Sequence, residues 1–327
     1  MVGPLDNVRV GTAGWQYPDW AGVFYPAPRP RGLDELAYIA SYFDLVEINS
    51  SFYRIPSAAT ARRWAERTSQ HDRFRFTAKA FHRFTHNAPA PAPGDLLAFR
   101  KAMEPLHDAG KLCAVLLQFP WSFKPSPASR ERIDGLARAL APLPLAIEVR
   151  HGSWMRGDGL QYLRDTGLTV SAVDQPVIGD SIEPLAHVAG SAGVYARLHG
   201  RNYRNWFAED AGRDARYDYL YSREQLTPWV EMVSRAARSG SQVSVVLNNH
   251  FRGQAPANAF EMMAMLSGDP VPAPRALRRA HPRLEDVTIP KGDPEVAEGW
   301  LFDALPGEDG DENQQEENAG GDFDIPR

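Results

Sequence analysis

Short apolar runs rich in β-branched residues recur along the chain, and the segments between them carry apolar residues at a helical period. The predicted strands are residues 8–14, 45–52, 74–80, 112–120, 145–151, 169–175, 194–200 and 242–250. Helical patterns separate most of them, for example TARRWAERT and SREQLTPWVEMVSRAARSG. Strands that alternate with helices predict parallel pairing through crossovers. Eight such units favour an α/β fold of the (β/α)₈ TIM-type barrel class over a doubly wound sheet.

The same pattern predicts a single barrel domain over residues 8–268 with two appended segments. The weakest unit is the sixth, where PVIGDSIEPLAHVAGSAG offers at most a short helix. Residues 269–305 begin with the proline-rich PVPAPRALRRAHPRL and are expected to form a C-terminal extension instead of a ninth unit. Residues 306–327 are acidic and rich in Gly, Gln and Asn, which predicts a disordered tail.

Composition and charge narrow the functional classes. The formal net charge is −5, but the last 23 residues carry −7, so the remainder is near +2. A nearly neutral body argues against a general nucleic-acid binder. No apolar run approaches the roughly 20 residues that span a bilayer, so we expect a soluble cytoplasmic protein without a membrane partner. The only cysteine, Cys113, excludes a disulfide framework and a cysteine metal cluster.

We expect the acidic tail to be dispensable for stability. It has few apolar side chains that could anchor it to the barrel. Truncation after Pro306 should therefore leave the melting temperature nearly unchanged in a thermal unfolding experiment. A large drop would show that the tail docks on the barrel.

Polar side chains stand at the ends of several predicted strands, where an apolar core would otherwise continue. In LVEINSSFY, Glu47 and Asn49 follow two apolar residues. Barrel strands tolerate charge mainly at the carboxyl-end mouth, which is also where such barrels carry active sites. Alternation places the following on shared faces: Glu47 with Asn49, Thr77 with Lys79, Glu148 with Arg150, and Tyr195 with Arg197 and His199, while Gln118 and Asp174 hold matching late positions.

Each of these charges could be only a structural ion-pair partner, but the set predicts a site. Desolvating many charges is costly, and apolar packing would serve stability alone. The cluster can also be neutral without a metal, because three acids face three bases: Glu47, Glu148 and Asp174 against Lys79, Arg150 and Arg197.

Aromatic and histidine side chains also follow the strand ends. Trp15, Tyr53 and Trp206 are the candidates for stacking on a ligand, and the long segment GRNYRNWFAEDAGRDARYDYLYS could bring Trp206 over the site. Among the histidines we favour His199, because alternation places it on the inward face with Arg197. On strand eight, either Asn249 or the pair of Asn248 and His250 points inward.

The sequence resembles the YecE-like family, also called domain of unknown function 72. The motifs that carry the resemblance occur in register between Val8 and Ser267: GTAGWQYPDWAGVFYP, VEINSSFYRIP, FTAKAFHRFTH, LLQFP, AIEVRHGSW, YARLHGRN, YDYLYS and VLNNHFRGQAPANA. The resemblance implies a TIM-type barrel and a loose relation to sugar isomerases, but no established reaction. The family motifs include Glu47, Asn49, Tyr53, Lys79, His86, Glu148, Arg150, Asp174, Arg197, His199, Asn249 and His250.

These observations favour an enzyme that acts by acid–base chemistry on a small sugar-like or anionic ligand. The predicted catalytic residues are Glu47, Glu148, Asp174 and His199, and the predicted substrate-binding residues are Asn49, Tyr53, Lys79, Arg150, Arg197, Asn249, Trp15 and Trp206. No cofactor and no metal are predicted. Two alternatives remain: a metal-dependent isomerase-like or endonuclease-like enzyme that uses Glu47, Glu148, Asp174 and His199 as ligands, and a non-catalytic barrel that binds a ligand or nucleic acid. The sequence predicts no oligomeric state.

Overall fold

The computed structural model describes residues 6–87, 89–185, 193–206 and 213–291. Eight parallel strands close into a barrel in chain order, and β1 pairs with β8 to complete it. The strands are β1 (Val8–Ala13), β2 (Leu45–Ile48), β3 (Arg75–Lys79), β4 (Leu112–Gln118), β5 (Leu145–Glu148), β6 (Thr169–Asp174), β7 (Gly193–Leu198) and β8 (Gln242–Leu247). Each predicted strand is present, so the predicted TIM-type barrel is confirmed.

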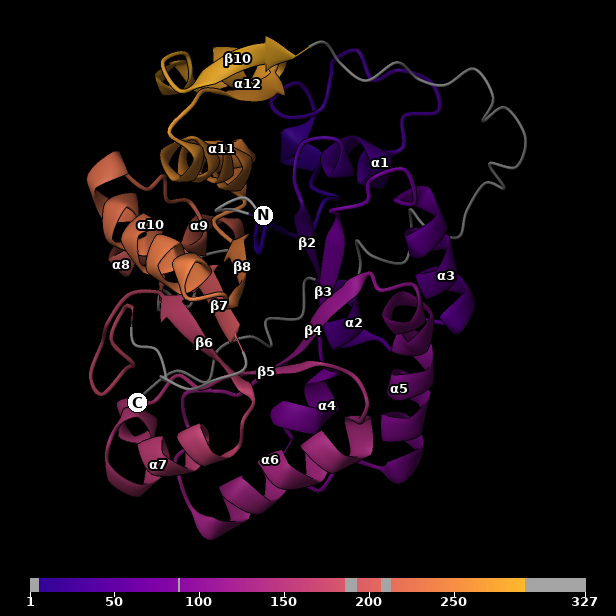
Figure 1. Ribbon diagram of the computed structural model, residues 1–327, viewed down its shortest axis with the longest axis vertical. Coiled ribbons are helices and arrows are strands. Elements are labelled where there is room, and N and C mark those ends of the chain that lie inside the picture. Colours follow the sequence, from indigo (N-terminus) through magenta and orange to yellow (C-terminus); the bar gives the residue numbers. More distant parts are fainter. Residues whose placement is uncertain (1–5, 88, 186–192, 207–212, 292–327) are drawn as a thin grey trace.

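Helices surround the barrel and cover the outer faces of its strands (Figure 1). The longer ones are α1 (Glu35–Ala40), α3 (Ala58–Arg67), α5 (Pro93–Asp108), α6 (Pro127–Leu140), α7 (Gly157–Asp165), α10 (Arg223–Arg238) and α11 (Gln254–Ser267). Several begin at the residue types that cap helices: Ser57, Ser126 and Ser222 each accept a backbone N–H three residues later. After β6, the described residues 175–185 contain no helix, and the rest of that predicted unit lies outside the described residues.

Short helical turns follow most strands at the carboxyl end of the barrel. They are η1 (Pro18–Trp20), α2 (Ser50–Tyr53), α4 (His82–Thr85), η2 (Gly152–Met155), α8 (Tyr203–Trp206), α9 (Arg213–Arg216) and η3 (Phe251–Gly253). The sequence pattern placed residues 49–52 in a strand, but β2 ends at Ile48 and α2 begins at Ser50. Beyond the strand ladder, a helical turn satisfies backbone groups that have no neighbouring strand to pair with.

Two apolar layers hold the barrel together. The outer layer lies between strands and helices and includes Val46, Ile48, Leu117 and Ile147. The smaller inner layer fills the barrel below the polar strand ends, and it contains Ala13, Leu45, Ala114, Leu116, Ala146, Tyr195 and Val246. The inner layer is a packed floor, so the polar side chains of the strand ends lie above it.

The C-terminal extension forms a small unit of its own on α11 (Figure 1). It consists of β9 (Val271–Pro274), α12 (Arg275–Ala280), η4 (Pro282–Leu284) and β10 (Thr288–Lys291), and the two strands pair in parallel apart from the barrel. Residues 292–327, including the predicted tail, lie outside the described residues, so the predicted boundaries at 305 and 306 stay predictions. Within the described ranges, no helix is long and apolar enough to cross a membrane.

Candidate active site

Arg197 of β7 is the centre of a buried cluster inside the barrel. Its Nη2 donates to Glu47 Oε1 of β2 at 2.7 Å, and its Nη1 donates to Glu148 Oε2 of β5 at 2.7 Å. Nη1 also lies 3.1 Å from Gln118 Oε1 of β4. Arg197 is 1% exposed and both glutamates are 0% exposed. One guanidinium therefore links three strands through charge-assisted hydrogen bonds that are screened very little by water.

Tyr195 supports the cluster from the inner apolar layer. Its hydroxyl lies 2.7 Å from Glu47 Oε2 and 2.8 Å from Thr77 Oγ1 of β3. Burial raises the pKa of Tyr195, and the nearby charge of Glu47 raises it further. The phenol thus stays protonated and gives Glu47 a second hydrogen bond, which fixes the carboxylate from below.

Glu148 is held as a carboxylate by two arginines. Arg150 donates from Nε and Nη2 to Glu148 Oε1 at 3.0 and 2.9 Å, while Arg197 takes the other oxygen. Burial raises the pKa of Glu148, but the positive charges of Arg197 and Arg150 outweigh burial and set the pKa at about 2. Glu148 is therefore a very weak base at neutral pH.

His199 lies beside this ion cluster with both ring nitrogens in polar surroundings. Its Nδ1 is 2.8 Å from Asn248 Nδ2 on the chain after β8. Its Nε2 is 3.3 Å from Arg197 Nη1 and 4.0 Å from Glu148 Oε1. The Asn248 amide nitrogen and the Arg197 guanidinium can only donate, and a neutral imidazole has one acceptor nitrogen, so the neutral ring can accept from only one of these two groups at a time.

Aromatic rings cover His199 at the mouth. Trp206 lies edge-on to the His199 ring with centroids 6.3 Å apart, and Tyr217 lies 6.5 Å away. Next to them, His250 stacks on Tyr17 at 4.4 Å with an interplanar angle of 12°. The loop between β7 and α10 thus brings Trp206 over the site, as its sequence position suggested.

Lys79, Tyr53 and Asn49 lie at the rim formed after β2 and β3. The Nζ of Lys79 is 4.2 Å from the centroid of Phe52, which is in α2, and Lys79 is 4% exposed. Tyr53 packs edge-on against the same Phe52 ring, and Asn49 directly precedes α2. Lys79 is the last residue of β3, while Asn49 and Tyr53 follow the end of β2, so all three stand at the carboxyl ends of strands next to the arginine cluster.

Asp174, predicted as a catalytic residue, faces away from the cluster. It pairs with Leu198, while its neighbour Val173 pairs with the inward-facing Arg197, so the Asp174 side chain is on the helix side of β6. There its two oxygens accept from Nε and Nη2 of Arg201 at 2.7 Å each, and Oδ2 also accepts from Trp229 Nε1 of α10 at 2.8 Å. The structure therefore separates Asp174 from Glu47 and Glu148.

Asn249 and Trp15 are also apart from the cluster. On strand eight the inward residue is Asn248, and Asn249 donates outward to Tyr219 O and Asn258 Oδ1. Trp15 packs edge-on against Trp64 of α3 with centroids 6.1 Å apart, inside the outer apolar layer. The structure thus brings together Glu47, Glu148, Arg150, Arg197 and His199, with Lys79, Tyr53, Asn49 and Trp206 around them.

The predicted site omitted some buried polar side chains at the mouth. Gln118 and Asn248 both touch the cluster, and their late inward positions in strands four and eight were the available signal. Gln175, which follows β6 and is 5% exposed, has an Oε1 atom without a hydrogen-bond partner among the described residues. Tyr217, the second ring over His199, begins the motif YDYLYS, but a long loop separates it from β7, so strand alternation could not place it over the site.

The arrangement of acids and histidines does not resemble a metal centre. Of the four ligands in the metal-dependent hypothesis, Asp174 is on the other face of its strand and both glutamates are bound to arginine. Over the described ranges, no three His, Cys, Asp or Glu side chains are placed to hold a metal ion.

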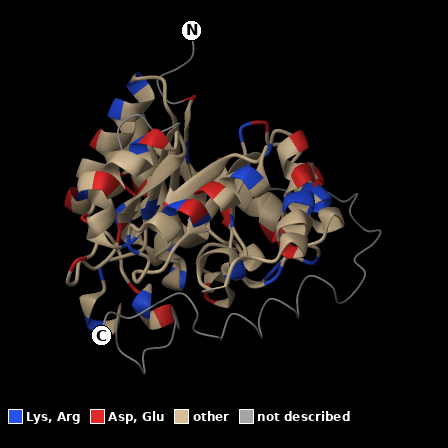
Figure 2. Ribbon diagram, turned by 90° about the horizontal axis from the view of Figure 1, so that it is seen from below, with Lys and Arg blue, Asp and Glu red and all other residues tan. Residues whose placement is uncertain are grey.

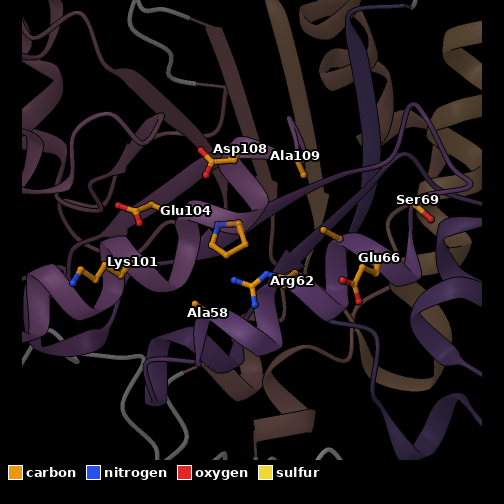
Figure 3. A pocket seen from close by; sticks show the side chains of 10 residues that line it. Ala58, Arg62, Glu66, Ser69, Lys101, Glu104, Asp108 and Ala109 are labelled. Atoms are coloured by element: carbon orange, nitrogen blue, oxygen red, sulfur yellow. The ribbon is translucent and has the colours of Figure 1, made fainter. Parts of the chain in front are cut away.

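A pocket of about 690 Å³ lies on the outer surface between α3 and α5, away from the barrel mouth (Figure 3). Its charged lining combines Arg62 and Lys101 with Glu66, Glu104 and Asp108. Figure 2 shows acidic and basic residues interspersed over the outer helices in the same way. We therefore place the candidate site at the mouth, where the charges are buried and convergent.

The closed barrel of eight parallel strands places this protein in the class of TIM-type barrels. Its buried charged cluster lies at the carboxyl ends of the strands, where such barrels carry their active sites. Residues 9–281 match the family model described as "Protein of unknown function DUF72", so the chain belongs to that family. The resemblance found in the sequence motifs is thereby confirmed.

Relatives with sequence or structure similarity support the same assignment. The UPF0759 protein YunF of Bacillus subtilis (strain 168) is 28% identical over 272 residues, which are 79% of this chain and 94% of the relative. A DUF72 family protein of Thermotoga maritima is 33% identical, with a TM-score of 0.67 and coverage of 80% of this chain and 99% of that one. A DUF72 family protein of Enterococcus faecalis is 26% identical, with a TM-score of 0.69 and coverage of 80% and 95%.

Proposed function

We propose that the barrel mouth is the active site of an enzyme that binds a small, anionic, sugar-like molecule and transfers a proton through His199. The observation that carries the proposal is the convergence of Glu47, Glu148, Arg150 and Arg197 beside His199, all at 4% exposure or less. Burying this many charges costs free energy that an apolar core would not. Such clusters of perturbed titratable groups are typical of catalytic sites.

The charges in the mouth support an anionic ligand. Because Asp174 lies on the outer face, the buried charged side chains of the mouth within the described residues are two carboxylates, Glu47 and Glu148, and three cations, Lys79, Arg150 and Arg197. The formal charges of this described set sum to a surplus of one positive charge. A phosphate or carboxylate group on the ligand would balance that charge.

His199 suits proton transfer better than either glutamate. Glu148 has a pKa of about 2, and Glu47 accepts from both Arg197 and Tyr195, so their lone pairs are engaged. An imidazole changes its protonation state near neutral pH at small cost. In this proposal the glutamates orient Arg197 instead of acting as the catalytic carboxylates expected from the sequence. Trp206 and Tyr217 would present flat apolar faces to a sugar ring.

The proposal is tested by thermal shift with ribose 5-phosphate, glucose 6-phosphate and gluconate, each compared with ribose and glucose, with and without MgCl₂ or MnCl₂. We expect the anionic compounds to raise the melting temperature and the neutral sugars to have no effect. A response that requires the divalent ion would favour the metal-dependent alternative. Lack of response to every compound would overturn the sugar-like ligand.

Lys79→Met is the variant that tests the surplus charge. It should lose most of the shift caused by the anionic compounds, because it removes the third cation. Lys291→Met is the matched control, since Lys291 lies over an aromatic ring in a similar way, 4.8 Å from the Tyr42 centroid, but in the C-terminal extension. An unchanged ligand response in Lys79→Met would contradict the proposed ligand charge.

A further inference from the structure

Asn258 of α11 is a fully buried amide that uses all of its hydrogen-bonding capacity. Its Oδ1 accepts from Tyr221 N at 3.0 Å and from Asn249 Nδ2 at 2.9 Å. Its Nδ2 donates to Tyr221 O at 3.0 Å and to Glu261 Oε2 at 2.7 Å. Since an amide offers two acceptor and two donor positions, its orientation is completely specified. Asn258 is 0% exposed.

These bonds reach both chain segments that carry the His199 contact. Asn249 directly follows Asn248, whose amide lies 2.8 Å from His199 Nδ1. On the other side, the Tyr221 hydroxyl accepts from the backbone N–H of Gly200, the residue after His199, at 2.7 Å. The Asn258 side chain, which lies in a helix outside the barrel, therefore anchors Asn249, the neighbour of Asn248, and Tyr221, which binds the neighbour of His199.

The network continues into the C-terminal extension. The other oxygen of Glu261, Oε1, accepts from Arg283 Nε of η4 at 2.6 Å. The Arg283 side chain is 33% exposed and the Glu261 side chain 8%. The chain of contacts thus runs from the segment 271–291 through Glu261 and Asn258 to the two strand ends that hold His199 and Asn248.

We propose that Asn258 is a positioning residue that holds the Asn248 amide against His199, and that the C-terminal extension takes part through Arg283 and Glu261. The functional meaning of this inference rests on the proposed role of His199. The hydrogen bonding of the His199 imidazole can be measured without any ligand, so its test does not depend on that role. The extension then serves the mouth in addition to covering α11.

The test is the ¹⁵N spectrum of the His199 ring in the full-length, ligand-free protein. In the wild type, a fixed donor at Nδ1 gives well-separated shifts for the two ring nitrogens. In Asn258→Ala, we expect these shifts to move toward the average of two tautomers. Arg283→Gln should give a smaller movement in the same direction, and Arg283→Lys should restore the wild-type pattern by keeping a cation near Glu261.

Asn7→Ala is the control, because Asn7 also donates two hydrogen bonds, to Ala237 O at 2.9 Å and Ser241 O at 2.7 Å, but at the amino end of the barrel. It should lower stability without moving the His199 shifts. If the His199 shifts in Asn258→Ala and in Arg283→Gln equal those in Asn7→Ala, the network is structural only and the inference is wrong. Arg283→Gln keeps the test decisive if Asn258→Ala does not fold, because Arg283 is partly exposed.

Discussion

Arg197→Met is expected to lower the free energy of unfolding by about 3 to 5 kcal/mol, as is typical when one member of a buried ion pair is removed. Methionine fills most of the volume but leaves Glu47 and Glu148 without their shared cation, and both are 0% exposed. Urea denaturation at neutral pH measures the effect. The midpoint should fall while the dependence of the free energy on urea stays the same.

Adding Glu47→Gln to Arg197→Met should raise the free energy of unfolding above that of Arg197→Met alone, because it removes one uncompensated buried charge. In the wild type, by contrast, Glu47→Gln leaves Arg197 with one partner fewer. Arg73→Met is the surface control. Arg73 contacts Asp6 and Asp44 with 45% of its side chain exposed, so its loss should cost about 0 to 1 kcal/mol. Equal costs for Arg197→Met and Arg73→Met would show that the buried cluster contributes no more than surface pairs.

Glu148→Gln should remove a large part of the acid dependence of stability. The pKa of Glu148 is held at about 2 by Arg197 and Arg150 against the opposing effect of burial, whereas the ordinary value is 4.5. Between these values the unfolded chain binds a proton that the folded protein does not, so the stabilisation is complete above pH 4.5 and decreases as the pH falls toward 2. The full shift corresponds to about 3 kcal/mol, of which about 2 kcal/mol is lost by pH 3.

The measurement is a series of urea denaturations from pH 7 to pH 3. The stability difference between wild type and Glu148→Gln should shrink by about 2 kcal/mol over this range. Glu104→Gln is the control, because Glu104 is 44% exposed and forms a surface pair with Arg100 at 3.8 Å. If the free energy of unfolding of Glu148→Gln falls with pH as steeply as that of the wild type, Glu148 is not held ionised by the arginines.

The sequence was sufficient to predict the barrel because each strand is buried on both faces and therefore appears as a continuous apolar run. The inward groups on strands two, five and seven were found by alternation within each strand, since Glu47, Glu148, Arg197 and His199 are polar exceptions in such runs. The register between strands was not available. It is the pairing of Val173 with Arg197 that turns Asp174 outward, and the pairing of Leu247 with Leu198 that makes Asn248 the inward residue.

Residues beyond a strand end were harder to place than residues inside it. Gly14 adopts a positive φ of 75° directly after β1, so the alternation stops there and Trp15 turns into the outer apolar layer. Asn258 could not be recognised because its partners outside α11 come from the loop before α10 and the segment after β8, which are brought together only in the folded chain.

The two-stranded sheet of the C-terminal extension has a further consequence for how molecules of this protein meet one another. Val271 N donates to Val287 O toward the partner strand, so the alternate positions of β9 direct their backbone nitrogens to the open edge. Those positions are Pro272 and Pro274, which have no N–H. A strand from another chain that approached this edge would find no backbone donors, so β9 is a poor template for intermolecular β pairing and aggregation.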